Sequence, residues 1–507
     1  MIFSRKIQTL LTALGIGCLV FLALYNQPYY PSTWFDEGLV LQGAMNIVRH
    51  GKYAMLSVEG FRILDQPLIA NGPGIVLPLS AIFSIFGIGL LQARMLASVF
   101  FLVTIWLFLR FTSRLYGLPA AVISLLILLS VPVEGFLMYG RQVLGNVPGL
   151  AYFFAGCLFF VSLCDRKHAG YAFASGLFFG LALLTKGQYW LIIPLWGLVI
   201  LADAFYYKQL GLKNGIILLG TIILCLASWQ LIQFILVGAE NYGTHLEAIS
   251  SSSKVTVFAF EPVRFLQSLW YLIRSGFMVF ILPALLIGAW ESRKRDGSGL
   301  VKFFLVVFVA IWVLWFLIAS IGWNRYVFEA YVVGSVLSGY AILKIKDSAS
   351  LLRNRFPIIG RPIPFDRVLV VIFLVVVILF ALIDFRIQIR SVVFYRDTSA
   401  FQFADHLEST VLPGEVIESW EWQIDALAPS LVFHHPTNDW VDKKTAEIHF
   451  GTPITDSYNL LEYKPAYLID GPFSKFTKMY SSEILGGCCV KVFSAGDYTL
   501  YQVMSSR

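Results

Sequence analysis

Long apolar runs separated by short polar loops are the main pattern of this 507-residue chain. A helix that crosses a membrane needs about 20 mainly apolar residues, and the runs approach or exceed that length. We therefore predict a polytopic α-helical membrane protein with roughly eleven spans. The runs lie near residues 7–25, 95–112, 118–135, 147–164, 169–186, 189–204, 214–237, 267–290, 301–321, 326–343 and 367–385.

The composition agrees with this pattern and excludes an ordinary soluble protein. Hydrophobic residues make up 58% of the chain and charged residues 14%, and the mean hydropathy is +0.73. Soluble domains contain about 25% charged residues. The first run follows Arg5 and Lys6, exceeds a typical signal-peptide core and precedes no small-residue cleavage site. We expect it to remain as an anchor.

Basic residues in the predicted loops favour one topology. If the N-terminus is cytoplasmic, the inner loops contain Arg110, Arg114, Arg166 and Lys167, as the positive-inside rule requires. The apolar stretch 72–91 must then lie on or dip into the outer leaflet. This bias accounts for most of the net charge of +7, so we expect no nucleic-acid partner. The sequence thus predicts a multi-pass protein of the plasma (inner) membrane with an extracytoplasmic C-terminus.

The chain changes character after about residue 386. A helix is predicted over 399–410, and strands over 415–420, 465–470, 489–495 and 498–503, with the turn signals PGE, DGP and AGD between them. We therefore expect two domains. Residues 1–385 form the transmembrane domain, with a catalytic first outer loop at 26–94, and residues 386–507 form a small soluble extracytoplasmic α/β domain.

Two adjacent carboxylates, Asp36 and Glu37, follow the first span. The residues after them have helical hydrophobic spacing, and we predict an amphipathic helix on the membrane surface with Asp36 at its N-terminal end. A carboxylate at a helix start is held ionised, which suits electrostatic work or proton acceptance. Alternatively, the pair is solvated or forms a salt bridge with Arg49 or Arg62.

Several segments together resemble a known family. They are DEGLVLQGAMNIVRHGKY, NGPGIVLPLSAIFSIFG, QARMLASVFFLVTIWLFLRFTSRLYG, GRQVLGNVPGLAYFFAG, GLALLTKGQYWLIIP and WNRYVFEAYVVGSVLSGYAI. Over roughly the first 345 residues the chain resembles the GT-C membrane glycosyltransferases, in particular the protein mannosyltransferase and aminoarabinose transferase group (glycosyltransferase families 39 and 83).

The resemblance implies a function and a catalytic residue. Such enzymes transfer a sugar from a polyprenyl-phosphate donor to an extracytoplasmic acceptor, here a lipid, a glycan or a protein, and we expect inversion at the sugar. The catalytic carboxylate of the family falls on Asp36, which we assign as the base that takes the acceptor proton. Glu37 then orients the first loop or hydrogen-bonds the acceptor. We expect no cofactor and assign no metal ligand, and dependence on a divalent metal stays open.

Basic residues at the outer ends of the spans are candidates for the donor phosphate. We assign Arg141, Lys186, Arg325 and Arg62 to this role. Many members of the family have Lys-Pro-Pro where this chain has ANGPG, so Asn71 stands near the place of a lysine that would meet the phosphate. The neutralising charge must then come from elsewhere, or the donor site differs.

Each candidate also has a purely structural interpretation. Lys186 could extend to the membrane interface, and Arg141 could cap the preceding helix or pair with Glu134. Arg325 could bridge Glu329, and Arg62 could close its own loop with Asp65. Arg94 is better interpreted as an anchor at the start of a span. The histidines of the tail, His434, His435 and His449, are only a weak signal for a metal.

Two other functional classes remain as alternatives. The chain could be a polytopic transporter, although a secondary transporter should show internal repeats and polar groups near the middle of the membrane. It could also be a non-catalytic component of envelope assembly that handles lipid-linked saccharides.

Overall fold

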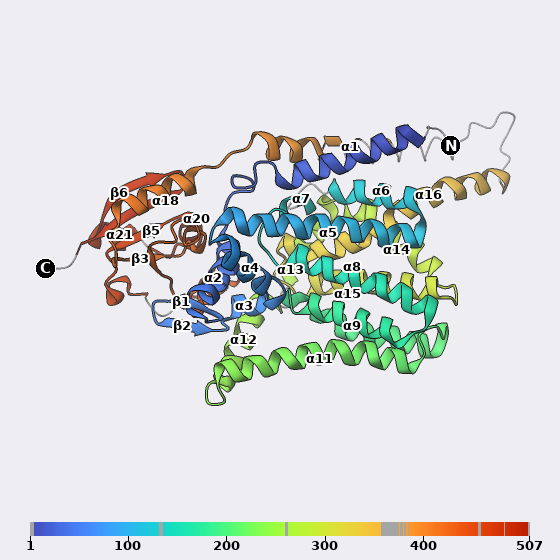
Figure 1. Cartoon of the computed structure of the whole chain (residues 1–507), viewed down its shortest axis with the longest axis horizontal. Coiled ribbons are helices and arrows are strands. Elements are labelled where there is room, and N and C mark those ends of the chain that lie inside the picture. The colour runs from blue at the N-terminus through green and yellow to red at the C-terminus, as the bar shows by residue number, and fades with distance from the viewer. Residues whose placement is uncertain are drawn as a thin grey trace.

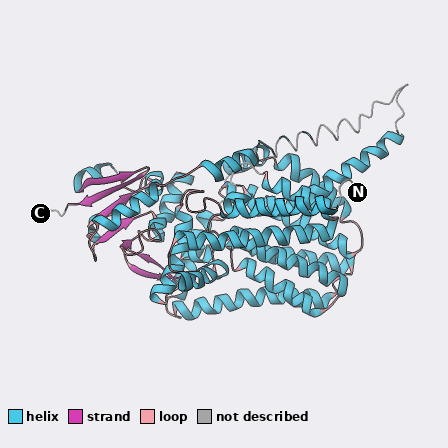
Figure 2. Cartoon of the chain, turned by 45° about the horizontal axis from the view of Figure 1, so that its top comes forward, coloured by secondary structure: helices cyan, strands magenta, loops and turns pink. Residues whose placement is uncertain are grey.

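The computed structural model describes residues 5–130, 135–258, 262–355, 375, 379, 382–383, 385–454, 458–480 and 482–504. Helices dominate the chain, and the strands gather at the end that carries the C-terminus (Figure 2). The protein is an integral multi-pass membrane protein with a small C-terminal sheet domain, which confirms the predicted fold class.

Most predicted spans are helices in the structure. Among the residues that the structure describes, six helical segments are long and apolar enough to cross a membrane: 90–116, 146–166, 187–207, 212–237, 297–318 and 324–344. Shorter apolar helices occupy three more of the predicted runs, and the run 367–385 falls largely outside the described residues. The helices of these runs are α1 (Arg5–Leu24), α5 (Leu90–Tyr116), α6 (Leu118–Leu129), α8 (Asn146–Arg166), α9 (Ala169–Leu183), η1 (Gly187–Leu191), α10 (Ile192–Ala202), η2 (Asp203–Tyr207), α11 (Leu212–Val237), α15 (Gly297–Ile318) and α16 (Phe328–Arg355).

The predicted span 267–290 is broken in the structure. Its residues form two helices, α13 (Pro262–Arg274) and α14 (Phe277–Glu291), whose axes meet at 87°. Gly276 joins them with φ of 76°, in the left-handed region that side chains rarely adopt. Mean hydropathy did not detect this break. Arg274, Ser275 and Gly276 are only three residues, and the apolar residues on either side of them keep the average over the window high.

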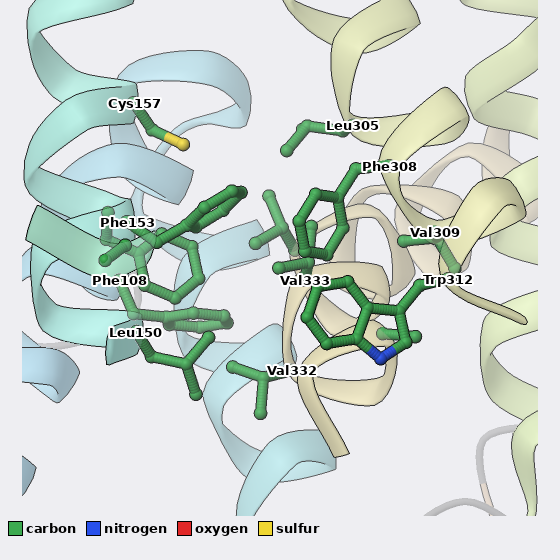
Figure 3. Close-up of a cluster of buried hydrophobic side chains, with 14 of the residues drawn as sticks. Phe108, Leu150, Phe153, Cys157, Leu305, Phe308, Val309, Trp312, Val332 and Val333 are labelled. Atoms are coloured by element: carbon green, nitrogen blue, oxygen red, sulfur yellow. The ribbon is translucent and has the colours of Figure 1, made fainter. Parts of the chain in front are cut away.

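Aromatic side chains fill the centre of the helical bundle. Phe108 and Phe153, from α5 and α8, face Phe308 and Trp312 of α15 across the core (Figure 3). The rings of Phe153 and Phe308 lie 4.7 Å apart, and Trp312 donates its Nε1–H to the Tyr326 carbonyl at 2.7 Å. The core therefore holds η3 (Asn324–Val327), which carries Arg325, against α15.

The C-terminal sheet confirms the predicted strands of the tail. Strands β3 (Val416–Ser419), β5 (Tyr467–Asp470), β6 (Cys489–Ala495) and β7 (Tyr498–Val503) occupy the four predicted segments, and α18 (Ser399–Thr410) matches the predicted helix. The sheet order is β4-β3-β5-β7-β6, in which β3 is parallel to both β4 and β5 and the other pairs are antiparallel. The sequence did not reveal β4 (Val432–His434), which has three residues.

The first outer loop lies between the bundle and the sheet domain (Figure 1). The predicted helix after the first span is α2 (Phe35–His50), and Gly51 ends it with φ of 64°. The first outer loop also contains β1 (Ala54–Ser57), β2 (Gly60–Ile63), α3 (Gln66–Ala70) and α4 (Pro73–Phe86). Two further helices, α7 (Phe136–Tyr139) and α12 (Tyr242–Thr256), lie in later loops, and the tail also contains η4 (Trp422–Ile424), α19 (Asn438–Phe450), η5 (Leu460–Tyr463), α20 (Pro472–Thr477) and α21 (Ser482–Cys488).

The sheet domain covers α2, the helix that the sequence predicts to lie along the membrane surface. Eleven of its sixteen residues are buried. A Cβ atom on Gly38 would lie 2.2 Å from the backbone nitrogen of Gln423, so only glycine permits this approach. Gln42 adds a hydrogen bond to Asp425 at 3.0 Å. The helix that begins beside Asp36 is thus fixed between two layers of protein.

Candidate functional site

Asp36 lies in the first turn of α2, where its carboxylate meets a residue 289 positions further along the chain. Its Oδ2 accepts a hydrogen bond from the guanidinium of Arg325 and a second, at 3.3 Å, from Trp34 Nε1. The side chains of Asp36 and Arg325 are 14% and 21% exposed, so a ligand can still reach both. Arg325 is therefore not the partner of Glu329 suggested by their spacing.

Two cavities meet at this ion pair. The larger, the aromatic cavity, has a volume of about 650 Å³ and is lined by Tyr30, Trp34, Tyr139, Trp323, Tyr395, Phe473 and Phe476 among others. The smaller, the lysine cavity, has a volume of about 280 Å³ and is lined by Gln66, Asn71, Lys186, Gln188, Ser253 and Asp442 among others. Asp36 and Arg325 line both cavities. A group bound in either cavity would therefore reach the same carboxylate and guanidinium.

Lys186 lies next to Asn71, the residue that stands near the place of the lysine that many members of the family have. It lies in the turn between α9 and η1, outside the spans, and its Nζ donates to Asn71 Oδ1 at 2.9 Å. Burial lowers the pKa of Lys186 and the nearby Arg325 lowers it further, while Asp36 and Glu329 raise it. The ammonium would gain a counterion from an anion in the lysine cavity. The structure thus brings together Asp36, Lys186 and Arg325 of the predicted site residues.

Glu37 points away from both cavities and is fully buried against Arg94. Its Oε2 accepts from Arg94 Nη2 at 2.7 Å, and its Oε1 accepts from Arg94 Nε and from the Val143 backbone N–H, each at 3.0 Å. Arg94 also donates to the carbonyls of Gln27 and Pro31. These contacts tie the first loop to α5, and the role of Glu37 in orienting the loop or binding the acceptor stays a prediction.

The structure places Arg141 and Arg62 away from the lining of either cavity. Arg141 is fully buried, and its guanidinium donates to the carbonyls of Leu22, Tyr25 and Tyr30, so it caps the end of α1. Arg62 forms ion pairs with Glu59 at 3.5 Å and with Asp65 at 3.4 Å, which close the β1–β2 hairpin region. Arg62 therefore has the partner, Asp65, that its structural interpretation names. Arg141 caps α1 and not the preceding helix α7, and Glu134, the other partner suggested for it, lies outside the described residues.

Sequence reasoning missed Asp442, which lines the lysine cavity from α19 of the sheet domain. Its Oδ1 accepts from Ser252 of α12 at 3.1 Å. Burial raises the pKa of Asp442 to about 7, and neighbouring Asp65 and Asp439 add to the rise. No pattern in the tail singled out this carboxylate, because its place in the lining of the lysine cavity depends on how α19 packs on α12.

Of the three histidines considered as metal ligands, His435 has structural partners. This side chain is buried between the Ser419 carbonyl, 2.6 Å from Nδ1, and Asp425 Oδ2, 2.8 Å from Nε2. The side chain of His449 is not among those described. Within the described residues, no group of three or more His, Cys, Asp or Glu side chains is placed to hold a metal ion.

Comparisons with known proteins confirm the resemblance to GT-C glycosyltransferases. A sequence profile described as dolichyl-phosphate-mannose-protein mannosyltransferase matches residues 66–232. No curated protein sequence matched the chain.

Two solved structures show where the fold occurs. The chain is similar to ArnT from Cupriavidus metallidurans bound to undecaprenyl phosphate, with 15% identity, a TM-score of 0.65 and 99% of each chain covered. It is also similar to the oligosaccharyltransferase AglB from Archaeoglobus fulgidus, in complex with an inhibitory peptide and a dolichol-phosphate. That match has 13% identity and a TM-score of 0.56, and covers 98% of this chain and 74% of AglB. The chain therefore has the GT-C fold over nearly its whole length.

Proposed function

We propose that this GT-C protein is a glycosyltransferase that moves a sugar from a polyprenyl-phosphate donor to an extracytoplasmic acceptor, with inversion at the sugar. The observation that carries the proposal is the position of Asp36 and Arg325 at the junction of two cavities, one of which contains the buried Lys186. The ArnT and AglB structures contain undecaprenyl phosphate and dolichol-phosphate respectively, which supports a lipid phosphate as ligand.

The lysine cavity suits the donor phosphate. Two cations, the buried Lys186 and the partly buried Arg325, line this cavity, and charge interactions at buried sites are stronger than in bulk water. Negative charge grows on the phosphate as the bond to the sugar breaks, so fixed cations stabilise the transition state more than the ground state. Lys186, held by Asn71, would supply the charge that the family's lysine supplies elsewhere.

The aromatic cavity suits the acceptor. An acceptor hydroxyl or amine that enters it reaches Asp36, which takes the proton as the nucleophile attacks the anomeric carbon from the side opposite the phosphate. The hydrogen bond from Arg325 fixes the direction of the Asp36 carboxylate. Phe473 and Phe476 of α20 line this cavity, so residues 386–507 would shape the acceptor side.

We further propose that the end of the molecule with the cavities is extracytoplasmic and that the N-terminus is cytoplasmic. Asp36 and Arg94 lie near the N-terminal end of α5, whereas Arg110 and Arg114 lie near its opposite end. The positive-inside rule places the end of α5 that carries Arg110 and Arg114 in the cytoplasm. The sheet domain, on the same side as Asp36, is then exposed to the acceptor.

A transfer assay tests the proposed function. Purified full-length protein in lipid nanodiscs receives a panel of radiolabelled polyprenyl-phosphate sugars together with an envelope extract as acceptor. We expect label in a product other than the donor, with release of polyprenyl phosphate. Label that crosses a liposome membrane without a new glycosidic bond would favour the transporter. Donor binding with neither outcome, across the panel, would favour the non-catalytic component of envelope assembly.

A further inference from the structure

A third cavity lies at the end of the bundle opposite to Asp36. This basic groove has a volume of about 580 Å³ and runs between α5, α8 and α9. Its polar residues are Arg110, Ser113 and Arg114 of α5 and Ser162 of α8, and its apolar residues include Trp106, Leu158, Phe159 and Phe178. No step of the proposed transfer uses it.

The basic residues of the groove differ in how they are held. Arg114 donates to Asp165 at 2.7 Å and to Ser162 at 2.9 Å, so its guanidinium is fixed against α8. Arg110 is exposed and makes no hydrogen bond or ion pair with any part of the chain that the structure describes. Asp165 neutralises one of the two positive charges, so the groove keeps a net charge of +1, which an anion could neutralise.

The apolar residues extend from these charges towards the middle of the bundle. Trp106, Arg110 and Arg114 are spaced by four residues and so lie along one side of α5. Trp106 is 60% exposed and lies about 15 Å from the end of α5 at 1.5 Å per residue. On the other wall, the rings of Phe159 and Phe178 stack at 5.4 Å. A ligand that fits has an anionic head and a hydrocarbon tail.

We propose that this groove binds an anionic glycerophospholipid. Its phosphate lies between Arg110 and Arg114, and an acyl chain lies along Trp106 and Phe159. Guanidinium groups recognise phosphate oxygens with paired hydrogen bonds, and basic pockets between membrane helices bind acidic head groups. A soluble phosphate would not contact the apolar wall of the groove. If Arg110 only extended its charge to the membrane interface, no apolar groove would be needed next to it.

Native mass spectrometry of the full-length protein, titrated with phosphatidylglycerol or phosphatidylcholine, tests the proposal. We expect the wild type to prefer phosphatidylglycerol, and Arg110→Gln to weaken that binding roughly 5-fold, as expected for one cation near an acidic lipid. Arg110 has no partner to lose, so this variant should fold normally. The double variant Arg110→Gln/Arg114→Gln should lose roughly 10- to 30-fold.

Arg293→Gln is the matched control. Arg293 also lies beside an exposed tryptophan at a helix end, with its Cζ 4.6 Å from the Trp290 ring, but it does not line the basic groove. Binding in this variant should equal that of the wild type. Equal loss in Arg293→Gln, equal binding of both lipids, or unchanged binding in Arg110→Gln would overturn the proposal. Displacement of the lipid by an equal concentration of free glycerol phosphate would overturn the role of the apolar wall.

Discussion

The buried ion pair between Glu37 and Arg94 predicts that loss of charge at Glu37 lowers stability much more than loss of charge at the neighbouring Asp36. Glu37→Gln keeps the size of the side chain but removes its charge. Because Glu37 receives hydrogen bonds at both oxygens, the new amide must direct its NH₂ group at a donor, either Arg94 Nη2 or the Arg94 Nε and Val143 N–H pair. Arg94 is then left as a buried charge without its counterion.

The expected loss of stability follows from the burial. Both side chains are 0% exposed, and removing one partner of such a pair costs about 3–5 kcal/mol. With an unfolding entropy of about 2.1 cal/mol/K per residue, a chain of 507 residues changes by about 1 kcal/mol per degree. We therefore expect Glu37→Gln to lower the Tm by about 3–5 °C.

Thermal unfolding of the purified protein in nanodiscs, followed by tryptophan fluorescence, measures this shift. Asp36→Asn is the control on the same helical turn, because its partner Arg325 remains partly exposed and can be hydrated. We expect Asp36→Asn to change the Tm by less than about 1 °C. A Tm of Glu37→Gln equal to that of the wild type would refute the view that this pair fixes the first loop.

Three further predictions concern the donor, the sheet domain and the topology. Lys186→Met should weaken donor binding and slow transfer. In the wild type, burial lowers the pKa of the Lys186 ammonium, so the affinity for polyprenyl phosphate should fall as the pH rises from 7 to 9.5. Unchanged affinity in a binding titration would contradict the phosphate role. Burial raises the pKa of Glu418 from 4.5 to about 8, so its contribution to stability is lost as the pH rises through 8. Glu418→Gln should therefore flatten the fall in Tm between pH 5 and 8. Parallel plots of Tm against pH for the variant and the wild type would contradict this. Ser430→Cys should react with a membrane-impermeant thiol reagent from outside intact cells and Ser298→Cys should not, and the reverse result would invert the topology.

Hydropathy predicted most of the helices, because crossing a membrane imposes a length and a composition that a short window detects. The same window treated the break at Gly276 as part of one span. The alternation of the tail likewise predicted four strands, but the three-residue β4 is too short to show alternation.

The candidate site was only partly predictable because its residues meet through long-range packing. The position of Asp36 after the first span was visible in the sequence, but its partner lies 289 residues away. Arg141 and Lys186 both stand at span ends, yet the first caps α1 and the second lines a cavity. Only the packing of α1 and α3 distinguishes them. For the same reason the sequence pointed to both Asn71 and Lys186 but not to the hydrogen bond between them.

The rate of sugar transfer by Asp36→Asn, at saturating donor and acceptor, tests the central claim most directly. Asparagine keeps the shape of the side chain and cannot accept the acceptor proton, so we expect turnover to fall roughly 10²- to 10⁴-fold. Donor binding should be unchanged or tighter, because Arg325 is freed from its carboxylate partner to meet the phosphate. Near-normal turnover would contradict the account, and Asp36 would then be only the partner that holds Arg325 in place.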